Sequence, residues 1–242
     1  MLFRSGGGTS VDYVGVPIVD PVAGTLVLTS TLEPTLLVLV AWLLPVVLGV
    51  VAGRVFCGWF CPYGTLARGL DALLLRVAPR WPRARIPRRR GLRYVILITA
   101  LVVGATGTQW LLYTLLPHAL VQQSVYGMWL MGGGGAALGS LLGLIAVSLV
   151  FGPTSYCALV CPTGAALALL GRGRVVHLAV VAPSRCAKSC DLCDRACWLD
   201  LRPSMNPGAD CDLCTRCTEV CPHHNLAIVS GKRPTALGRA TL

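Results

Sequence analysis

The chain has 242 residues, of which 55% are hydrophobic and 13% are charged, and its formal net charge at pH 7 is +11. Soluble domains carry roughly 25% charged residues, so this composition and a mean hydropathy of +0.69 argue against an ordinary soluble protein. Ten acidic residues leave few groups for acid–base catalysis, and no nucleotide-binding loop, serine–histidine arrangement or pair of catalytic carboxylates stands out.

The first two thirds of the chain are predicted to be membrane-embedded. Within residues 1–33, the moderately apolar stretch from Val14 to Leu32 is interrupted by Pro17, Asp20, Pro21 and Gly24, so we expect an external or interfacial segment there. A spanning helix needs about 20 mostly apolar residues. Within residues 34–182, three stretches meet this requirement, at residues 35–52, 94–116 and 128–151. The sequence therefore predicts an all-α polytopic membrane domain with about three transmembrane helices.

Basic residues are distributed unevenly around these spans. Ten arginines lie between the first and second spans, ten Lys and Arg residues follow the third, none lies between the second and third, and Arg4 precedes the first. Because positive charge stays on the cytoplasmic side, this places the C-terminal region inside and the N-terminus outside. Such an N-terminus needs either a further span upstream or translocation of its short tail. This rule on the side of positive charge also accounts for the net charge of +11, so the charge does not indicate a nucleic-acid partner.

One motif, aromatic-Cys-x3-Cys-Pro-x-Gly, occurs twice, after the first and third spans. One copy contains Cys57 and Cys61, and the other contains Cys157 and Cys161. The repetition indicates an internal duplication, and the proline is typical of the first turn of a new helix. The four thiols could ligate a third metal or iron–sulfur centre, act as redox dithiols, or pack as small buried hydrophobes. The duplication argues against packing alone.

Eight more cysteines form two tight runs within residues 183–230, ahead of a basic tail at residues 231–242. The second run has the spacing C-x2-C-x2-C-x3-C-P, with which bacterial ferredoxins bind a [4Fe–4S] cluster. The sequence therefore predicts a small α+β two-cluster ferredoxin-like domain. The two runs are Cys186, Cys190, Cys193 and Cys197, then Cys211, Cys214, Cys217 and Cys221.

In two-cluster ferredoxins, the fourth ligand of each cluster comes from the other run. This rule assigns the first cluster to Cys186, Cys190, Cys193 and Cys221, and the second to Cys211, Cys214, Cys217 and Cys197. The first run departs from the pattern in having three residues between its first two cysteines, and Trp198 in place of a proline. Zinc sites use CxxC pairs about fifteen residues apart, and disulfides need an oxidising compartment, so both alternatives are disfavoured.

The four histidines give little support to a haem between the spans, because only His118 lies near a span end. His118 together with Trp110 and Tyr113 is a candidate quinol site. The competing interpretation is that aromatic residues are simply common at membrane interfaces. Glu33 is the other candidate proton acceptor, and its ordinary interpretation is a charge complementing the dipole of a helix N-terminus.

Two CxxxCP motifs followed by a two-cluster ferredoxin domain resemble the NapH and NosR group of polytopic membrane iron–sulfur proteins, from about Val16 to Ile228. The resemblance implies a multi-pass protein of a bacterial or archaeal inner membrane with a cytoplasmic ferredoxin domain. It would pass electrons between a cytoplasmic or quinol-pool donor and a respiratory-type acceptor, through a redox partner protein or membrane subunit. The alternative function is a maturation factor that uses reduced clusters or thiols on a metalloenzyme.

The chain departs from that group in two respects. It lacks the periplasmic flavin-binding domain of NosR-like members, and it has three predicted spans where four or more are usual. As an enzyme it would be at most an electron-transfer component, such as a subunit of a quinol dehydrogenase.

Overall fold

The computed structural model describes residues 10–13, 16–30, 36–77, 90–105, 116–121, 124, 135–152, 156–182, 186 and 190–231. The chain divides into two compact units. The first combines Met1–Val47 with Phe60–Ala166, and the second combines Leu48–Trp59 with Leu167–Leu242. The basic tail beyond residue 231 lies outside the described residues.

The first unit begins with an antiparallel hairpin of β1 (Ser10–Tyr13) and β2 (Val16–Val19), in which Tyr13 pairs with Val16. Helical elements make up the rest of its described part. They are α1 (Pro21–Ser30), most of α2 (Leu36–Ala52), α4 (Pro62–Val77), α5 (Arg90–Ala105), α8 (Gly135–Phe151), the π-helix η1 (Tyr156–Val160) and the first half of α9 (Pro162–Leu170).

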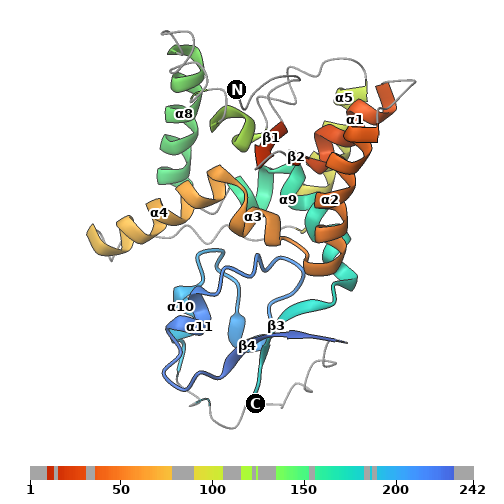
Figure 1. The fold of residues 1–242 in the computed structure, drawn as a ribbon. Helices are drawn as coiled ribbons and strands as arrows, with labels where there is room; N and C mark the ends of the chain where they lie inside the picture. The colour runs from red at the N-terminus through yellow and green to blue at the C-terminus, as the bar shows by residue number, and fades with distance from the viewer. Residues whose placement is uncertain are drawn as a thin grey trace. The chain divides into compact units, whose positions relative to one another are not determined.

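The core of the first unit is small and aliphatic, and it forms where α1 packs against α5 (Figure 1). Gly104 on α5 makes this contact possible, because a Cβ at that position would overlap the side chain of Leu26 on α1. A glycine inside a helix costs about 1 kcal/mol relative to alanine, so close packing is the physical reason for it here. The buried cluster comprises Val22, Ala23, Leu26, Leu97, Ala100, Leu116, Ala119 and Ala165.

Asp20, with 2% of its surface exposed, connects three segments of the first unit. Its Oδ1 accepts hydrogen bonds from the backbone N–H groups of Val22 (2.9 Å) and Ala23 (3.0 Å), which caps the N-terminus of α1. Its Oδ2 accepts a 2.7 Å hydrogen bond from the hydroxyl of Thr163 on α9 and lies 3.4 Å from Nε2 of His118. A buried carboxylate is tolerated only with such partners, so Asp20 fixes the relative positions of these segments.

The second unit is organised around two strands. β3 (Val176–Val180) and β4 (Leu226–Ser230) pair antiparallel, with Val176 opposite Ser230 and Val180 opposite Leu226. This pairing closes residues 181–225, which contain all eight C-terminal cysteines. That segment also forms α10 (Leu192–Ala196), the 3-10 helix η4 (Pro203–Met205) and α11 (Arg216–Glu219), and α10 and α11 lie together beside the strands (Figure 1).

The segment Leu48–Trp59 belongs to the second unit because its backbone approaches the end of α9 closely. Gly53 ends α2 with φ of 72°, in the left-handed region that favours glycine. A Cβ on Gly171 would lie 2.6 Å from the Cα of Gly53, so glycine is required at this contact. The backbone N–H of Val175 then donates a 2.9 Å hydrogen bond to the carbonyl of Val51.

The prediction of an all-α polytopic membrane domain is wrong for this structure. Among the residues that the structure describes, no helix has both the length and the apolar character needed to cross a membrane. α2 and α8 have 17 residues each and α5 has 16. At 1.5 Å per residue, a 17-residue helix extends about 26 Å, short of the roughly 30 Å of a bilayer core. The β1–β2 hairpin also departs from an all-α unit.

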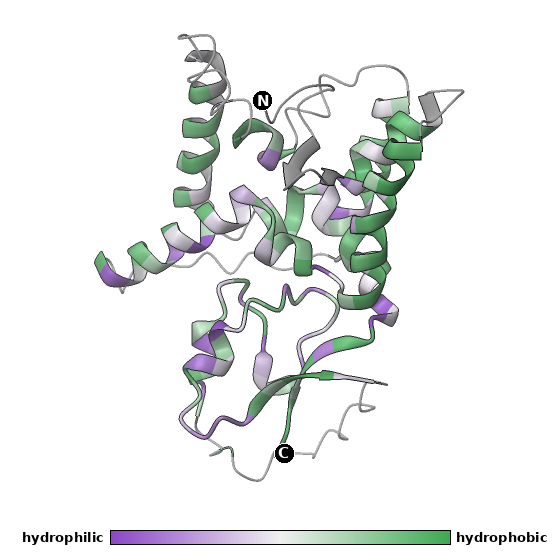
Figure 2. Ribbon diagram, in the orientation of Figure 1, coloured by the Kyte–Doolittle hydropathy of each residue, from purple (hydrophilic) through white to green (hydrophobic). Residues whose placement is uncertain are grey.

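The apolar segments lie where hydropathy placed them, and the described helices that they form are short. α2 is hydrophobic along its whole length (Figure 2) and matches the predicted stretch 35–52 to within one residue, ending just before the left-handed Gly53. α8 ends at Phe151, as the predicted stretch does. α5 begins at Arg90, four residues before the apolar stretch predicted at residues 94–116, and therefore includes Arg93.

Replacing Asp20 tests its capping role. We expect Asp20→Ala to lower the free energy of unfolding by about 1–3 kcal/mol, because a lost N-cap costs about 0.5–2 kcal/mol and a buried unsatisfied hydroxyl adds to that. Asp20→Asn is the matched control, since its side-chain oxygen can still cap α1. Urea unfolding followed by circular dichroism measures both variants, and equal losses of stability would contradict the capping role.

Candidate metal centres

Four cysteines from the two C-terminal runs surround one cavity in the second unit. Cys197 follows α10, Cys211 and Cys214 lie on the next loop, and Cys217 lies on α11. Leu178 of β3 and Ile228 of β4 contribute to the apolar wall of this cavity. The structure thus brings Cys197 to the three cysteines of the other run. This is the set that the sequence assigns to the second cluster, and the assignment of ligands stays a prediction.

The loop between these cysteines is held in an unusual backbone conformation. Leu213 has φ of 55° and Thr215 has φ of 63°, so residues on both sides of Cys214 are left-handed. Such values are rare for bulky and β-branched side chains, and they persist only where the surroundings enforce them, often at functional sites. Here the hydroxyl of Thr218 donates a 2.6 Å hydrogen bond to the Thr215 carbonyl, and the indole N–H of Trp59 donates a 3.2 Å hydrogen bond to the Leu213 carbonyl.

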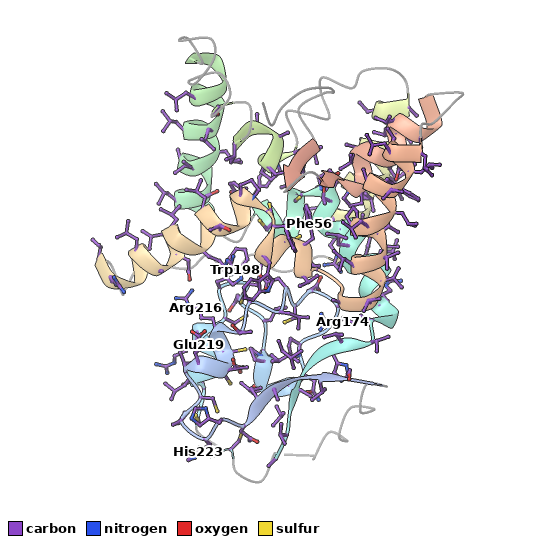
Figure 3. The ribbon with its side chains drawn as sticks, in the orientation of Figure 1. Phe56, Arg174, Trp198, Arg216, Glu219 and His223 are labelled. Atoms are coloured by element: carbon purple, nitrogen blue, oxygen red, sulfur yellow. The ribbon has the colours of Figure 1, made fainter. Side chains whose placement is uncertain are left out.

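Two buried charges flank the same loop. Arg174, 3% exposed, donates hydrogen bonds to the carbonyls of Cys211 (2.9 Å) and Gly208 (3.1 Å). Asp212, 2% exposed, accepts a 2.9 Å hydrogen bond from the indole N–H of Trp198. Trp198 and Arg174 lie toward the opposite end of this unit from His223 (Figure 3). Arg174 and Asp212 were not predicted as site residues, because nothing in the neighbouring sequence distinguishes them from surface charges.

Burial raises the pKa values of the thiols around the cavity. It raises the pKa of Cys197 to about 11 and the pKa values of Cys214 and Cys217 to about 12. The negative charge of Asp212 adds to the effect on Cys214, and the neighbouring Cys211 and Cys197 add to the effect on Cys217. Without a cluster these groups are neutral thiols at pH 7, so binding iron requires the release of their protons.

The remaining four cysteines of the two runs are more accessible. Cys186 and Cys190 are exposed, and Cys193 and Cys221 are partly buried. Asn225 connects the first and last of them, because its backbone N–H donates to Sγ of Cys221 (3.4 Å) and its side-chain Nδ2 donates to Sγ of Cys186 (3.0 Å). The structure therefore relates Cys186 to Cys221, as the predicted first cluster requires, although this ligand set also stays a prediction.

The two CxxxCP motifs adopt matching local structures. α4 begins at Pro62 and α9 begins at Pro162, which confirms the prediction that each proline opens a helix. In each copy the carbonyl of the preceding cysteine accepts the first helical hydrogen bond, from Thr65 to Cys61 and from Ala165 to Cys161, both at 3.1 Å. Cys157 lies on η1 and Cys57 on α3 (Val55–Trp59). The division of the chain assigns Cys57 to the second unit and the other three to the first.

Two tyrosines lie among the three motif cysteines of the first unit. The hydroxyls of Tyr63 and Ser148 are 2.7 Å apart, and the rings of Tyr63 and Tyr156 meet edge to face with centroids 5.9 Å apart. Burial raises the pKa of both phenols, and nearby thiol groups, including those of Cys157 and Cys161, raise them further. Both phenols are therefore protonated, and they can donate hydrogen bonds in this region.

A single metal ion and an iron–sulfur cluster need different arrangements of donor side chains. Within the described part of the chain, no three or more His, Cys, Asp or Glu side chains converge as they would around a single metal ion. A cubane cluster instead takes one thiolate at each of four separate iron corners, and four cysteines around an apolar cavity suit that arrangement. The residues that are present therefore fit an iron–sulfur cluster better than a single ion.

His118 is buried in the first unit, and its Nε2 lies 3.4 Å from the Asp20 carboxylate. Trp110, Tyr113 and Glu33, the other members of the candidate quinol site, lie outside the described residues. Asp20 was not singled out as a site residue from the sequence, where it is an isolated acid between two apolar stretches. The quinol hypothesis stays a prediction.

Comparison with known proteins gives a consistent set of similarities. Residues 34–85 and 134–178 match the profile of the 4Fe-4S binding domain. Those two stretches contain the four CxxxCP cysteines and none of the eight cysteines of the C-terminal runs. No solved structure matches the chain.

Three curated relatives are similar over most of the chain. Two are uncharacterized proteins of Methanocaldococcus jannaschii, one 28% identical over 74% of this chain and 65% of its own length, the other 30% identical over 72% and 70%. The third is the ferredoxin-type protein NapH of Haemophilus influenzae, 27% identical over 85% of this chain and 73% of its own length. The chain thus spans 65% of the length of the first Methanocaldococcus jannaschii protein, 70% of the length of the second and 73% of the length of NapH.

The raised thiol pKa values predict how the iron-free protein responds to pH. Above the ordinary thiol pKa of 9.0, the unfolded chain releases protons that the folded protein still holds on Cys197, Cys214 and Cys217. Because the folded state then binds more protons, stability falls as the pH rises from about 9 toward 12.

Urea midpoints of iron-free protein between pH 8 and 11 measure this dependence. A Cys214→Ser, Cys217→Ser variant should show a shallower decline, because serine does not titrate in this range. An unchanged midpoint across the range in the wild type would contradict the expectation.

Proposed function

Because the chain belongs to the NapH/NosR-type iron–sulfur electron-transport family, we propose that it carries electrons through two [4Fe–4S] clusters bound in its second unit. Its membership makes it a 4Fe-4S-binding electron-transfer protein. The number of clusters, their ligands and the partners are the proposal. A bound [4Fe–4S] cluster accepts and releases one electron at a time, and the protein's residues set its position and potential.

The observation that carries the proposal is the cavity lined by Cys197, Cys211, Cys214 and Cys217. Cysteines separated by up to 20 positions in the sequence lie around one apolar space, and no disulfide joins them. A single free cysteine often packs as a small buried hydrophobe, but four cysteines with ferredoxin spacing around one apolar space are what a [4Fe–4S] cluster needs. The second cluster is therefore the more buried of the two.

The first cluster is proposed as the place where a partner protein exchanges electrons. Its predicted ligands Cys186 and Cys190 are exposed, whereas Cys211 and Cys217 of the second cluster are buried. An electron exchanged with a partner has the shortest path through the exposed ligands. Electrons then pass singly between the two clusters within the same unit, so the protein undergoes no net chemical change.

The second cluster is also close to the first CxxxCP motif within the second unit. Gly58 lies against the Asp212 backbone, where a Cβ would come within 2.6 Å of the carbonyl oxygen, and Trp59 is hydrogen-bonded to Leu213. Cys57 therefore lies one residue from a segment in direct contact with the ligand loop. This contact supports a functional link between the motif and the second cluster.

We further propose that the protein works at the cytoplasmic face of a membrane, because its net charge of +11 is attracted to anionic headgroups there. α2 carries nine exposed large apolar residues: Leu36, Leu37, Leu39, Val40, Leu43, Leu44, Val47, Val50 and Val51. An exposed apolar surface of this size is characteristic of a site that contacts a membrane or another protein.

Cell fractionation tests the proposed location. We expect the chain to sediment with membranes, and Val40→Gln with Leu44→Gln to weaken that association, because both side chains are exposed on α2. Val181→Gln with Met205→Gln changes two exposed apolar residues of the second unit and is the control. Recovery of the wild-type chain in the membrane-free supernatant would rule out the location.

Metal and sulfide analysis tests the function itself. Anaerobically purified protein should contain about eight iron atoms for two clusters, or about twelve if the CxxxCP cysteines also bind a cluster. A variant with Cys57, Cys61, Cys157 and Cys161 changed to serine separates these outcomes, since EPR would show one signal lost and two retained in the second case. A preparation with zinc and no iron would overturn the proposal.

A further inference from the structure

Asn225 occupies a special position in the second unit. It follows Cys221 by four residues, directly precedes β4, and is 3% exposed. As described above, its backbone and side-chain nitrogens donate hydrogen bonds to the sulfurs of Cys221 and Cys186. One buried residue thus contacts a cysteine from each run, across 35 positions of the chain.

The orientation of the Asn225 carboxamide is determined by its other contacts. Its Oδ1 accepts a 2.7 Å hydrogen bond from the N–H of Ala182, and its Nδ2 donates a 2.6 Å hydrogen bond to the carbonyl of the same residue. If the carboxamide were flipped, its NH₂ group would face the N–H of Ala182 and its oxygen would face the carbonyl of Ala182. Neither contact would be a hydrogen bond, so the flipped orientation is excluded. The second proton of Nδ2 is therefore directed to Cys186.

The main chain of Asn225 is fixed as well. Its carbonyl accepts a 2.9 Å hydrogen bond from the N–H of Val181, immediately beyond β3. The residue is thus tied to β3 through Val181, to the segment leading toward Cys186 through Ala182, and to β4 by its own position in the chain. All four of its polar groups are used, and two of them face sulfur.

We propose that Asn225 is a positioning residue for the first cluster: it holds Cys186 and Cys221 together as ligands and raises the reduction potential through N–H···S hydrogen bonds to both. This inference rests on the proposed two-cluster function. Reduction adds one electron, and so one negative charge, to the cluster and its thiolates. Donors directed at the sulfurs stabilise that charge more in the reduced form, and such hydrogen bonds are a recognised determinant of cluster potential.

The test uses the full chain, purified anaerobically, with dithionite as the reductant in an EPR-monitored redox titration. Asn225→Ala removes the Nδ2 donor and leaves the backbone donor to Cys221. We expect the midpoint of one signal to become more negative by about 59 mV, a tenfold change in the ratio of oxidised to reduced cluster for a one-electron couple. Asn225→Asp should shift the same signal further, because it places a carboxylate oxygen beside Cys186.

Two controls identify the affected cluster. Cys186→Ser and Cys221→Ser should each alter the signal that Asn225→Ala shifts, and the other signal should keep its midpoint. Asn206→Asp is the matched asparagine control, since its amide oxygen accepts a hydrogen bond from the Val180 N–H (3.4 Å) in the same unit. Its two midpoints should equal those of the wild type.

Each outcome has a distinct meaning. A larger negative shift or a selective loss of the same signal in Asn225→Asp, with the other signal retained at its wild-type midpoint, supports the positioning role. Unchanged midpoints in an Asn225→Ala protein with wild-type iron content overturn this inference and leave the proposed function intact. Equal shifts or losses of both signals in both Asn225 variants overturn it as well, because they indicate a general structural effect. A wild-type protein without iron would instead overturn the proposed function.

Discussion

The pairing of β3 with β4 is the constraint on which the cysteine-rich unit depends. The two strands bring residues 180 and 226 opposite one another and so close the whole intervening segment. Closing a long flexible loop costs entropy that grows slowly with its length, and here one strand pair closes a single loop that contains both cysteine runs. Leu178 and Ile228, a cross-strand pair in this register, also face the cavity that the second set of thiols surrounds. The sheet is thus both the closure of the loop and a wall of the site.

Within that closed loop, the two predicted ligand sets lie in different environments. The second set lies between the buried charges of Arg174 and Asp212, on a loop whose left-handed residues are held by hydrogen bonds from Trp59 and Thr218. The first set is more exposed and is organised by the amide of Asn225. Burial, nearby charge and hydrogen bonds to sulfur are the variables through which proteins set cluster potentials. The two sites therefore have a physical basis for different potentials, which is what directional transfer between them requires.

In the first unit, the apolar sequence predicts where the helices lie but not how they contact one another. Hydropathy identified the apolar segments that became α2, α5 and α8, because the composition of each segment is a local property. It also located the ends of α2 and α8, but not the start of α5, which lies at Arg90, four residues before the predicted stretch. The contacts of Gly104 with Leu26 and of Asp20 with Thr163 join residues far apart in the chain and have no local signature.

By itself, the sequence determined the identity of the twelve cysteines, their spacing, the repeat of the CxxxCP motif and the helix starts at Pro62 and Pro162, because these follow from spacing and from the fixed geometry of proline. The spacing also predicted the grouping of Cys197 with Cys211, Cys214 and Cys217, which lie around one cavity. Only the tertiary structure decided that Leu178 and Ile228 form part of the wall of that cavity, and that Asn225 lies between Cys186 and Cys221. It also decided that Leu48–Trp59 packs with the C-terminal unit. These arrangements depend on strand register and on backbone contacts between distant residues, and a linear spacing does not encode either of them.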